Sequence, residues 1–544
     1  MISTFKKIIE KPIFILIAVN VLIGLFIFRD FGLAWDEPLF YSYGDALGYA
    51  YSPKEWFSGD FDLRNSYGAS ADDHKNRGPA YLFLARNFVF GLEALGSDSA
   101  SAWHLVNFLF FQLGVYFLHR ISKRWMSEPA AFFTALFFST QPLLWGHAFI
   151  NPKDPPFMTF FLASVCMGFE MVDAIAQNVK DRTKKILIAS FLLGIATSVR
   201  VLGPYAGVLV FIYFLAKRGT IRDKSARRSF VLYGFVAVVV MFVTWPYLWE
   251  NPLRNFLEVF RFMSDNPTQL GLLFEGEVYR ANNLPRRYFP FMLATTLTEP
   301  ALPLFIVGLA AGWWKPAKDR AESNETRRDR IVSLSLLLLW FVVLIAYVLI
   351  RRPSMYDGIR HFLFILPPIF VFIGLAFELA MRIVNTLTRS FFRWMKSTWA
   401  IPPFWLYAGA MLVLILPGVF WIVKLHPYEY TYYNLYIGGT NTAFRTYETD
   451  YWLTCYKDAV KALDERTTAL VKLFVKRESY IAARYADENI QVVELRGAED
   501  EIQSGDYVLV NSRLNDDLSV FSAAPAVIEI GRVGATFCTI RQIP

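Results

Sequence analysis

The sequence predicts an α-helical polytopic membrane protein of about eleven transmembrane helices, followed by a small C-terminal α/β domain. The 544 residues are 55% hydrophobic and 17% aromatic, with a mean hydropathy of +0.33, which exceeds what soluble chains usually carry. Apolar runs of spanning length recur from residue 12 to residue 424, separated by short basic tracts. Beyond them the composition becomes that of an ordinary globular domain. We therefore expect a membrane domain over residues 1–427 and a soluble domain over residues 428–544.

The apolar runs were compared with the roughly 20 residues that a helix needs to cross a bilayer. The first run follows Lys6, Lys7 and Lys11, as in a signal peptide. It is long, however, and lacks a small-residue cleavage site, so we expect an uncleaved first span. The predicted spans centre on residues 12–29, 102–119, 129–149, 156–175, 186–200, 203–217, 229–248, 291–313, 331–350, 361–382 and 403–424.

Charge predicts the orientation of these spans. The basic tracts fall on one side, at residues 120–124, 180–185, 217–228, 315–330 and 382–396. By the positive-inside tendency the N-terminus is cytoplasmic, and the large loops 30–100 and 249–290 and the C-terminal domain are extracytoplasmic. A bacterial inner membrane fits this arrangement. The formal charge of +8 belongs to these loops, so nucleic acid is not expected as a partner.

One further apolar run, at residues 78–96, is predicted to lie along the membrane interface. Counting it as a span would invert every later loop and place the basic tracts outside.

The C-terminal domain shows alternating strand and helix patterns. Strands are predicted at 469–475, 490–495, 506–510, 526–530 and 536–540, with a helix at 478–487. We expect a packing or acceptor-binding role for this domain. Of the three cysteines, Cys166 lies in an apolar run, whereas Cys455 and Cys538 lie in the tail and could pair in an oxidising compartment.

The acidic pair Asp36-Glu37 follows the first span directly. Carboxylates are costly near hydrocarbon, which favours a functional role, and a carboxylate there can serve as a general base. Neighbouring aromatic residues such as Trp35 and Tyr41 would suit a sugar. The alternative is that one of the two acids caps a helix beginning at Pro38.

Two more polar groups lie on the same predicted side. Ala71-Asp-Asp-His-Lys-Asn-Arg-Gly-Pro79 holds His74 and Arg77, and Asn151-Pro-Lys-Asp-Pro-Pro156 opens the fourth span. Each combines carboxylate and cation. Alternatively, Asp154 caps the span and Lys153 only reaches toward lipid headgroups.

The fourth group, Arg351-Arg-Pro-Ser-Met-Tyr-Asp-Gly-Ile-Arg-His361, places three arginines on the side where few are expected. Such cations suit an anionic ligand such as a lipid phosphate, although headgroup anchoring is the alternative. Arg200, near the far end of span five, and Arg286, in the loop after span seven, are further phosphate candidates.

In this order, the groups resemble the polytopic lipid-phosphate-sugar glycosyltransferases of the GT-C class. The resemblance is to the bacterial relatives of dolichyl-phosphate-mannose protein mannosyltransferases and of the lipid A aminoarabinose transferase, the family 39 type. It covers about the first 430 residues. Where many relatives have His-Pro-Pro, this chain has Asp73-His-Lys-Asn-Arg-Gly-Pro79. The matching features are the acidic pair Asp36-Glu37, the segment His74 to Pro79, the Lys-Asp-Pro turn within 151–156, the loop Leu284-Pro-Arg-Arg-Tyr-Phe-Pro290, and Arg360-His361 ahead of Pro367-Pro368.

The resemblance implies transfer of a sugar from a polyprenyl-phosphate donor to a protein, lipid or glycan acceptor on the extracytoplasmic face, with inversion. Asp36 would be the base, and Glu37 would position it or a sugar hydroxyl. Asp154 would orient the sugar or acceptor. The other substrate-binding candidates are Asn151, Lys153, His74, Arg77, Arg200, Arg286, Tyr356, Arg360 and His361.

Two alternatives concern the chemistry. Asp36, Glu37 and Asp154 offer hard oxygen ligands for a divalent metal, but relatives of this pattern do not generally require one, so neither a metal nor another cofactor is predicted. A transporter or flippase of a lipid-linked or anionic solute could use the same charges. Its signature would be charges in mid-span and matching broken helices in two halves, which the sequence does not show.

Overall fold

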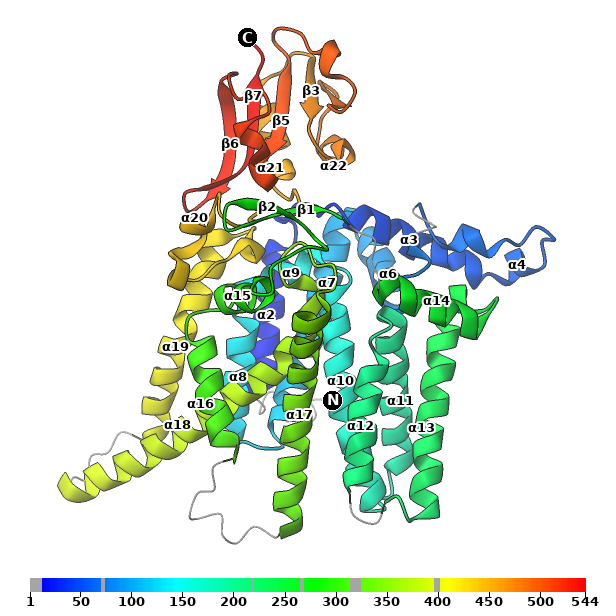
Figure 1. The fold of residues 1–544 in the computed structure, drawn as a ribbon, viewed down its shortest axis with the longest axis vertical. Helices are drawn as coiled ribbons and strands as arrows, with labels where there is room; N and C mark the ends of the chain where they lie inside the picture. The colour runs from blue at the N-terminus through cyan, green and yellow to red at the C-terminus, as the bar shows by residue number, and fades with distance from the viewer. Residues whose placement is uncertain (1–11, 70–73, 218–219, 265–268, 314–323, 396–401) are drawn as a thin grey trace.

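The computed structural model describes residues 12–69, 74–217, 220–264, 269–313, 324–395 and 402–544. A bundle of long helices carries a small sheet domain at one end, and the C-terminus lies in that domain (Figure 1). Short helices and a β-hairpin lie between the two parts (Figure 1).

The bundle contains a helix at each predicted span. Six of the described helices are long and apolar enough to cross a membrane, as expected for an integral multi-pass membrane protein. Helix α10 is central, since 89% of its apolar window is buried, against 22% for α13. The bundle helices are α2 (Pro12–Ile27), α7 (Ser99–Ser122), α8 (Glu128–Ser139), α9 (Pro142–Ile150), α10 (Asp154–Ala176), α11 (Arg182–Val199), α12 (Pro204–Ala216), α13 (Lys224–Val243), α16 (Ala301–Trp313), α17 (Asn324–Arg351), α18 (Leu366–Met395) and α19 (Pro403–Leu425).

The predicted span at 129–149 is divided into α8 and α9. Pro142, at the first position of α9, has no N–H to continue the helical ladder. The Gln141 side-chain amide instead donates to the Phe137 carbonyl and to the Thr298 hydroxyl, both at 3.0 Å. Helix α9 therefore begins as a separate helix at Pro142. Its C-terminal end is followed by Asn151, which belongs to the candidate site.

The loop elements lie at the end of the bundle that carries the sheet domain, some beneath that domain and others beside it (Figure 1). Helix α6 occupies the run predicted as an interfacial helix and packs on α3 and α7. Its Phe88 and Phe90 are exposed. These elements are α3 (Glu37–Ala50), α4 (Pro53–Trp56), α6 (Ala80–Ala94), α14 (Pro252–Ser264), α15 (Tyr288–Thr295), strands β1 (Gly271–Phe274) and β2 (Glu277–Arg280), and the 3₁₀ helices η1 (Leu63–Ser66), η2 (Pro246–Leu248) and η4 (Arg360–Ile365).

The C-terminal domain is built on a five-stranded sheet of order β4-β3-β5-β7-β6. Strand β3 is parallel to β4 and β5, whereas β7 is antiparallel to β5 and β6. All the predicted strands are present. The elements are α21 (Tyr456–Arg466), β3 (Val471–Val475), α22 (Ser479–Ala483), β4 (Ile490–Glu494), η7 (Glu499–Glu501), β5 (Tyr507–Asn511), η8 (Arg513–Leu518), β6 (Ala526–Arg532) and β7 (Ala535–Gln542).

The helix predicted over 478–487 is shorter than expected. Helix α22 ends at Ala483. Beyond it, the Tyr485 hydroxyl accepts a hydrogen bond from the Leu33 amide at 2.9 Å, so a contact with the membrane domain holds the chain outside the helix.

Residues 428–455 pack on the bundle rather than in the sheet. The Asn434 amide donates to the Ala294 and Leu297 carbonyls at 2.8 and 2.9 Å. This segment contains η5 (Glu429–Thr431), η6 (Leu435–Ile437) and α20 (Gly439–Ala443). Cys455, at its end, forms a disulfide bond with Cys538 of β7, as the sequence allowed. The sheet domain therefore starts at α21, and the segment from the predicted boundary at residue 428 links it to the bundle.

Candidate active site

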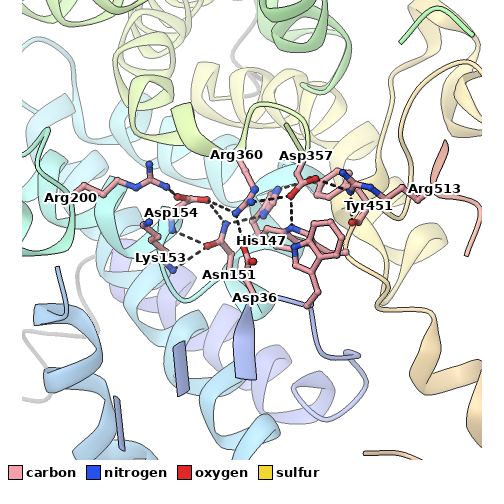
Figure 2. Close-up of polar contacts among 12 residues, drawn as sticks. Asp36, His147, Asn151, Lys153, Asp154, Arg200, Asp357, Arg360, Tyr451 and Arg513 are labelled. Atoms are coloured by element: carbon pink, nitrogen blue, oxygen red, sulfur yellow. Dashed lines mark hydrogen bonds and ion pairs between the residues drawn. The ribbon is translucent and has the colours of Figure 1, made fainter. Parts of the chain in front are cut away.

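Carboxylates and guanidinium groups alternate where α3, α10 and η4 begin (Figure 2). Asp36 Oδ2 lies 3.1 Å from Arg360 Nη1, and Asp357 Oδ2 lies 2.9 Å from Arg360 Nη2. Asp154 Oδ2 is 3.8 Å from Arg360 Nη1, and its other oxygen pairs with Arg200. Three carboxylates thus share one buried guanidinium, whose side chain is only 4% exposed.

Asp36 keeps a partly open carboxylate. It precedes the first residue of α3, but its side chain makes no capping hydrogen bond, so the capping alternative is not observed. Its side chain is 28% exposed. A carboxylate held by one arginine and open on another side can accept a proton from a bound group.

Glu37 points into a different environment. It is fully buried, and its carboxylate accepts hydrogen bonds from the Ala34 amide at 2.6 Å and from the Tyr41 hydroxyl. His104 Nε2 of α7 lies 3.1 Å from the same group. The structure therefore corrects the prediction that Glu37 positions Asp36 or a sugar hydroxyl. Glu37 instead joins the start of α3 to α7. Within the part of the chain that the structure describes, Glu37, Asp36 and Asp154 do not form a group close enough to hold one metal ion.

Asn151 organises the turn that opens α10. Its Oδ1 accepts hydrogen bonds from the Lys153 and Asp154 amides at 3.1 and 2.9 Å, and its Nδ2 donates to Asp154 Oδ2 at 2.9 Å. The Asp154 side chain is consequently engaged by Asn151 and Arg200, not by the helix N-terminus. This turn holds Asp154 beside Arg360 while Lys153 lines a neighbouring cavity.

That cavity measures about 360 Å³ and is lined by cationic, other polar and apolar side chains. The walls come largely from α14, α17 and the turn between α11 and α12. Its polar lining is Asn76, Arg77, Lys153, Arg200, Ser264, Ser354, Tyr356 and His361, and its apolar lining includes Val199, Val201, Leu202, Tyr205, Phe260, Phe262, Met263, Val343, Leu344, Tyr347, Pro353 and Phe362.

Tyr356 and His361 join the cavity to the charged cluster. The Tyr356 ring lies 4.7 Å from the His361 ring and 5.0 Å from the Arg360 guanidinium carbon. Both rings line the cavity, as does Arg77. These three predicted residues are therefore brought together with Lys153 and Arg200.

Two predicted residues lie elsewhere. His74 is buried and packs edge-on against Phe40 at 4.9 Å, and it does not line the cavity. Arg286 is exposed in the loop ahead of α15 and is not part of the cavity lining. Tyr288 and Phe289, at the start of α15, turn inward and leave Arg286 at the surface, so the structure does not bring Arg286 to the cavity as predicted.

Residues 78–249 match the family model for dolichyl-phosphate-mannose-protein mannosyltransferase. Among solved structures, the apo oligosaccharyltransferase of Archaeoglobus fulgidus is 10% identical; the match covers 91% of this chain and 69% of that one, with a TM-score of 0.50. The chain has the GT-C fold. The family match confirms the predicted resemblance and agrees with the predicted class of enzyme, a membrane glycosyltransferase.

Two further structures are similar to this GT-C protein. ArnT from Cupriavidus metallidurans, bound to undecaprenyl phosphate, is 14% identical over 97% of both chains, with a TM-score of 0.49. The arabinofuranosyltransferase AftD from Mycobacteria is 14% identical over 97% of this chain and 41% of that one, with a TM-score of 0.44. No curated protein sequence matches the chain.

Sequence reasoning missed several residues that belong to the candidate site. His147 Nε2 lies 3.0 Å from the Tyr451 hydroxyl, and the Trp452 indole N–H donates to Asp357 Oδ2 at 3.0 Å. Asp357 stood inside the arginine-rich loop and could have been found there as the partner of Arg360. Tyr451 and Trp452 follow the last bundle helix, and no local pattern points to them.

The ionisation of Glu448, which lies in this buried polar region, can be tested through the pH dependence of stability. It is 6% exposed, and burial raises its pKa to about 8. A carboxyl whose pKa is raised on folding contributes stability that is complete below its unfolded pKa and is lost as the pH rises through the folded value. We expect Glu448→Gln to gain thermal stability relative to the parent protein as the pH rises from about 6 to about 9.

The measurement is the unfolding midpoint of the purified protein at several pH values. Glu501→Gln, at an exposed position of the sheet domain, is the control. A difference between Glu448→Gln and the parent that does not change with pH would show that Glu448 is already ionised.

Proposed function

We propose that this GT-C protein is an inverting glycosyltransferase, which moves a sugar from a polyprenyl-phosphate donor to an acceptor hydroxyl or amine. One observation carries the proposal: a largely apolar cavity, whose lining includes Arg77, Lys153 and Arg200, adjoins the charged cluster that contains Asp36. A lipid phosphate has this chemistry, since its chain is apolar and its headgroup is anionic. The donor type named in the matching family is also a lipid phosphate sugar.

The polyprenyl phosphate leaving group is anionic and fits the cations of the cavity. Arg77, Lys153 and Arg200 all line this cavity. Cations placed where phosphate charge develops lower the barrier to departure, most strongly where little water enters. The cavity's apolar walls would take the first units of the polyprenyl chain.

The reacting sugar would lie between this phosphate site and Asp36. Asp36 removes the proton from the acceptor, the acceptor atom attacks the anomeric carbon, and the bond from that carbon to the phosphate oxygen breaks. Polyprenyl phosphate leaves with the electron pair of that bond. Because attack and departure occur on opposite faces, the configuration inverts. Arg360 holds the Asp36 carboxylate at 3.1 Å, and Asp154 is placed to orient the sugar or acceptor.

The proposal places the site on the extracytoplasmic face of a bacterial inner membrane, with the N-terminus in the cytoplasm. The basic tracts support this orientation by the positive-inside tendency. The Cys455–Cys538 disulfide supports an oxidising compartment for the sheet domain. The acceptor is then a protein, lipid or glycan of the cell envelope.

The test uses the full-length protein in lipid nanodiscs with polyprenyl-phosphate sugars and envelope extracts from cells that lack the gene. We expect release of polyprenyl phosphate together with glycosylation of an acceptor in the extract. Envelope glycans, lipids and glycoproteins from cells with and without the gene should differ by the same product. Solute or lipid movement across the membrane, with no missing glycan, would instead identify a transporter or flippase.

A further inference from the structure

Arg513 belongs to the C-terminal domain but reaches the charged cluster of the membrane domain. It begins η8, just after β5, and its side chain is 1% exposed. Its Nη1 donates to Asp357 Oδ1 at 2.8 Å and to the Tyr451 carbonyl at 2.7 Å, and its Nη2 donates to the Gly271 carbonyl at 3.2 Å. The guanidinium is therefore held in one orientation by three parts of the chain.

Asp357 is shared between two arginines. Its Oδ1 faces Arg513, and its Oδ2 lies 2.9 Å from Arg360 Nη2 and accepts from Trp452 at 3.0 Å. Arg360 in turn holds Asp36. Figure 2 shows the resulting row of charges running from Arg513 through Asp357 and Arg360 to Asp36.

A second set of contacts joins the same domain to the chain just before Asp36. The Arg513 guanidinium carbon lies 4.7 Å from the centre of the Trp35 ring. The Tyr480 hydroxyl, from α22, donates to the Trp35 carbonyl at 2.7 Å. The C-terminal domain thus contacts Trp35, which precedes Asp36, and Asp357, which pairs with Arg360.

We infer that Arg513 is a positioning residue, through which the C-terminal domain holds Arg360 and Asp36 in their reactive arrangement. This inference rests on the proposed function. Without Arg513, the buried Asp357 carboxylate keeps Arg360 as its main cationic partner. Arg360 would then move toward Asp357 and away from Asp36, because a buried carboxylate without a cationic partner is strongly destabilising.

The chain offers a matched control for simple docking of the domain. Arg445 pairs with Asp517 through two contacts of 2.6 Å, so it anchors the same η8 turn without touching Asp357. A role limited to anchoring the turn predicts similar losses for Arg445→Gln and Arg513→Gln.

The experiment measures sugar transfer by the full-length protein in nanodiscs. We expect Arg513→Gln to lower kcat about 100-fold, with donor KM changed less than about threefold, because small misplacements of a catalytic group are costly. Arg513→Lys, which keeps the charge, should recover part of this loss, and Arg445→Gln should retain most of the activity. Equal losses in Arg513→Gln and Arg445→Gln would overturn the inference.

A double-mutant cycle tests the route through Asp357. In an Asp357→Asn background, Arg513→Gln should lower kcat less than it does in the parent protein, since one of the two carboxylates that Arg513 pairs with, Asp357 and Glu448, is gone. Additive losses would contradict the inference while leaving the proposed function intact. If the parent protein neither binds polyprenyl phosphate by native mass spectrometry nor transfers a sugar, the proposed function itself fails.

Discussion

Asp36→Asn should leave the protein folded in membranes and lower sugar transfer by about 10²- to 10⁴-fold, the usual contribution of a general base. Asparagine has nearly the same shape and can still accept the hydrogen bond from Arg360. It cannot take a proton from the acceptor. The loss should therefore appear in kcat, with donor binding preserved.

The measurement is transfer from a polyprenyl-phosphate sugar by the full-length protein, together with native mass spectrometry of bound polyprenyl phosphate. Asp60→Asn, at an exposed position in the loop between α3 and α6, serves as the control and should retain full activity. Unchanged turnover in Asp36→Asn would remove Asp36 as the base.

Lys153→Met should lower kcat/KM for the donor by about 100-fold, because it removes one cation from the site where phosphate charge develops. Methionine keeps the apolar stem, which matters because the Lys153 side chain is buried and its Nζ lies 5.6 Å from the centre of the Phe40 ring. The KM for the acceptor should change little, since the lysine lines the cavity and not the open side of Asp36.

The kinetic constants for donor and acceptor are measured separately, with Lys424→Met as the control. Lys424 lies exposed near the end of α19, close to the Phe420 ring, so its substitution also removes a lysine near an aromatic residue. Parallel losses for donor and acceptor would count against phosphate binding by Lys153.

Much of the candidate site could be predicted because it depends on local chemistry and on sidedness. Asp36, Lys153 and Arg360 stand at the ends of apolar runs, where charge is costly without a partner. Placing their loops on one face was enough to expect them to meet. Arg200 was expected on the same grounds, and the structure joins it to Asp154.

Other assignments failed because side-chain direction depends on packing. Asp36 and Glu37 are adjacent, yet one faces Arg360 and the other faces His104. The start of α3 turns their side chains in different directions. The sequence of the pair does not indicate which carboxylate remains accessible. The prediction for Arg286 was wrong because Tyr288 and Phe289, which begin the next helix, face inward and leave the arginine exposed.

The sequence by itself determined the membrane class, the strands of the sheet domain and the gathering of the charged loops at one end of the bundle, because hydropathy and charge act through composition over short stretches. Only the tertiary structure decided that Glu37 leaves the site, that Asp357 joins it, and that Arg513 reaches it from the C-terminal domain. Those pairings connect residues far apart in the chain, and they are selected by the packing of whole elements, since a buried charge is stable only where folding brings its partner.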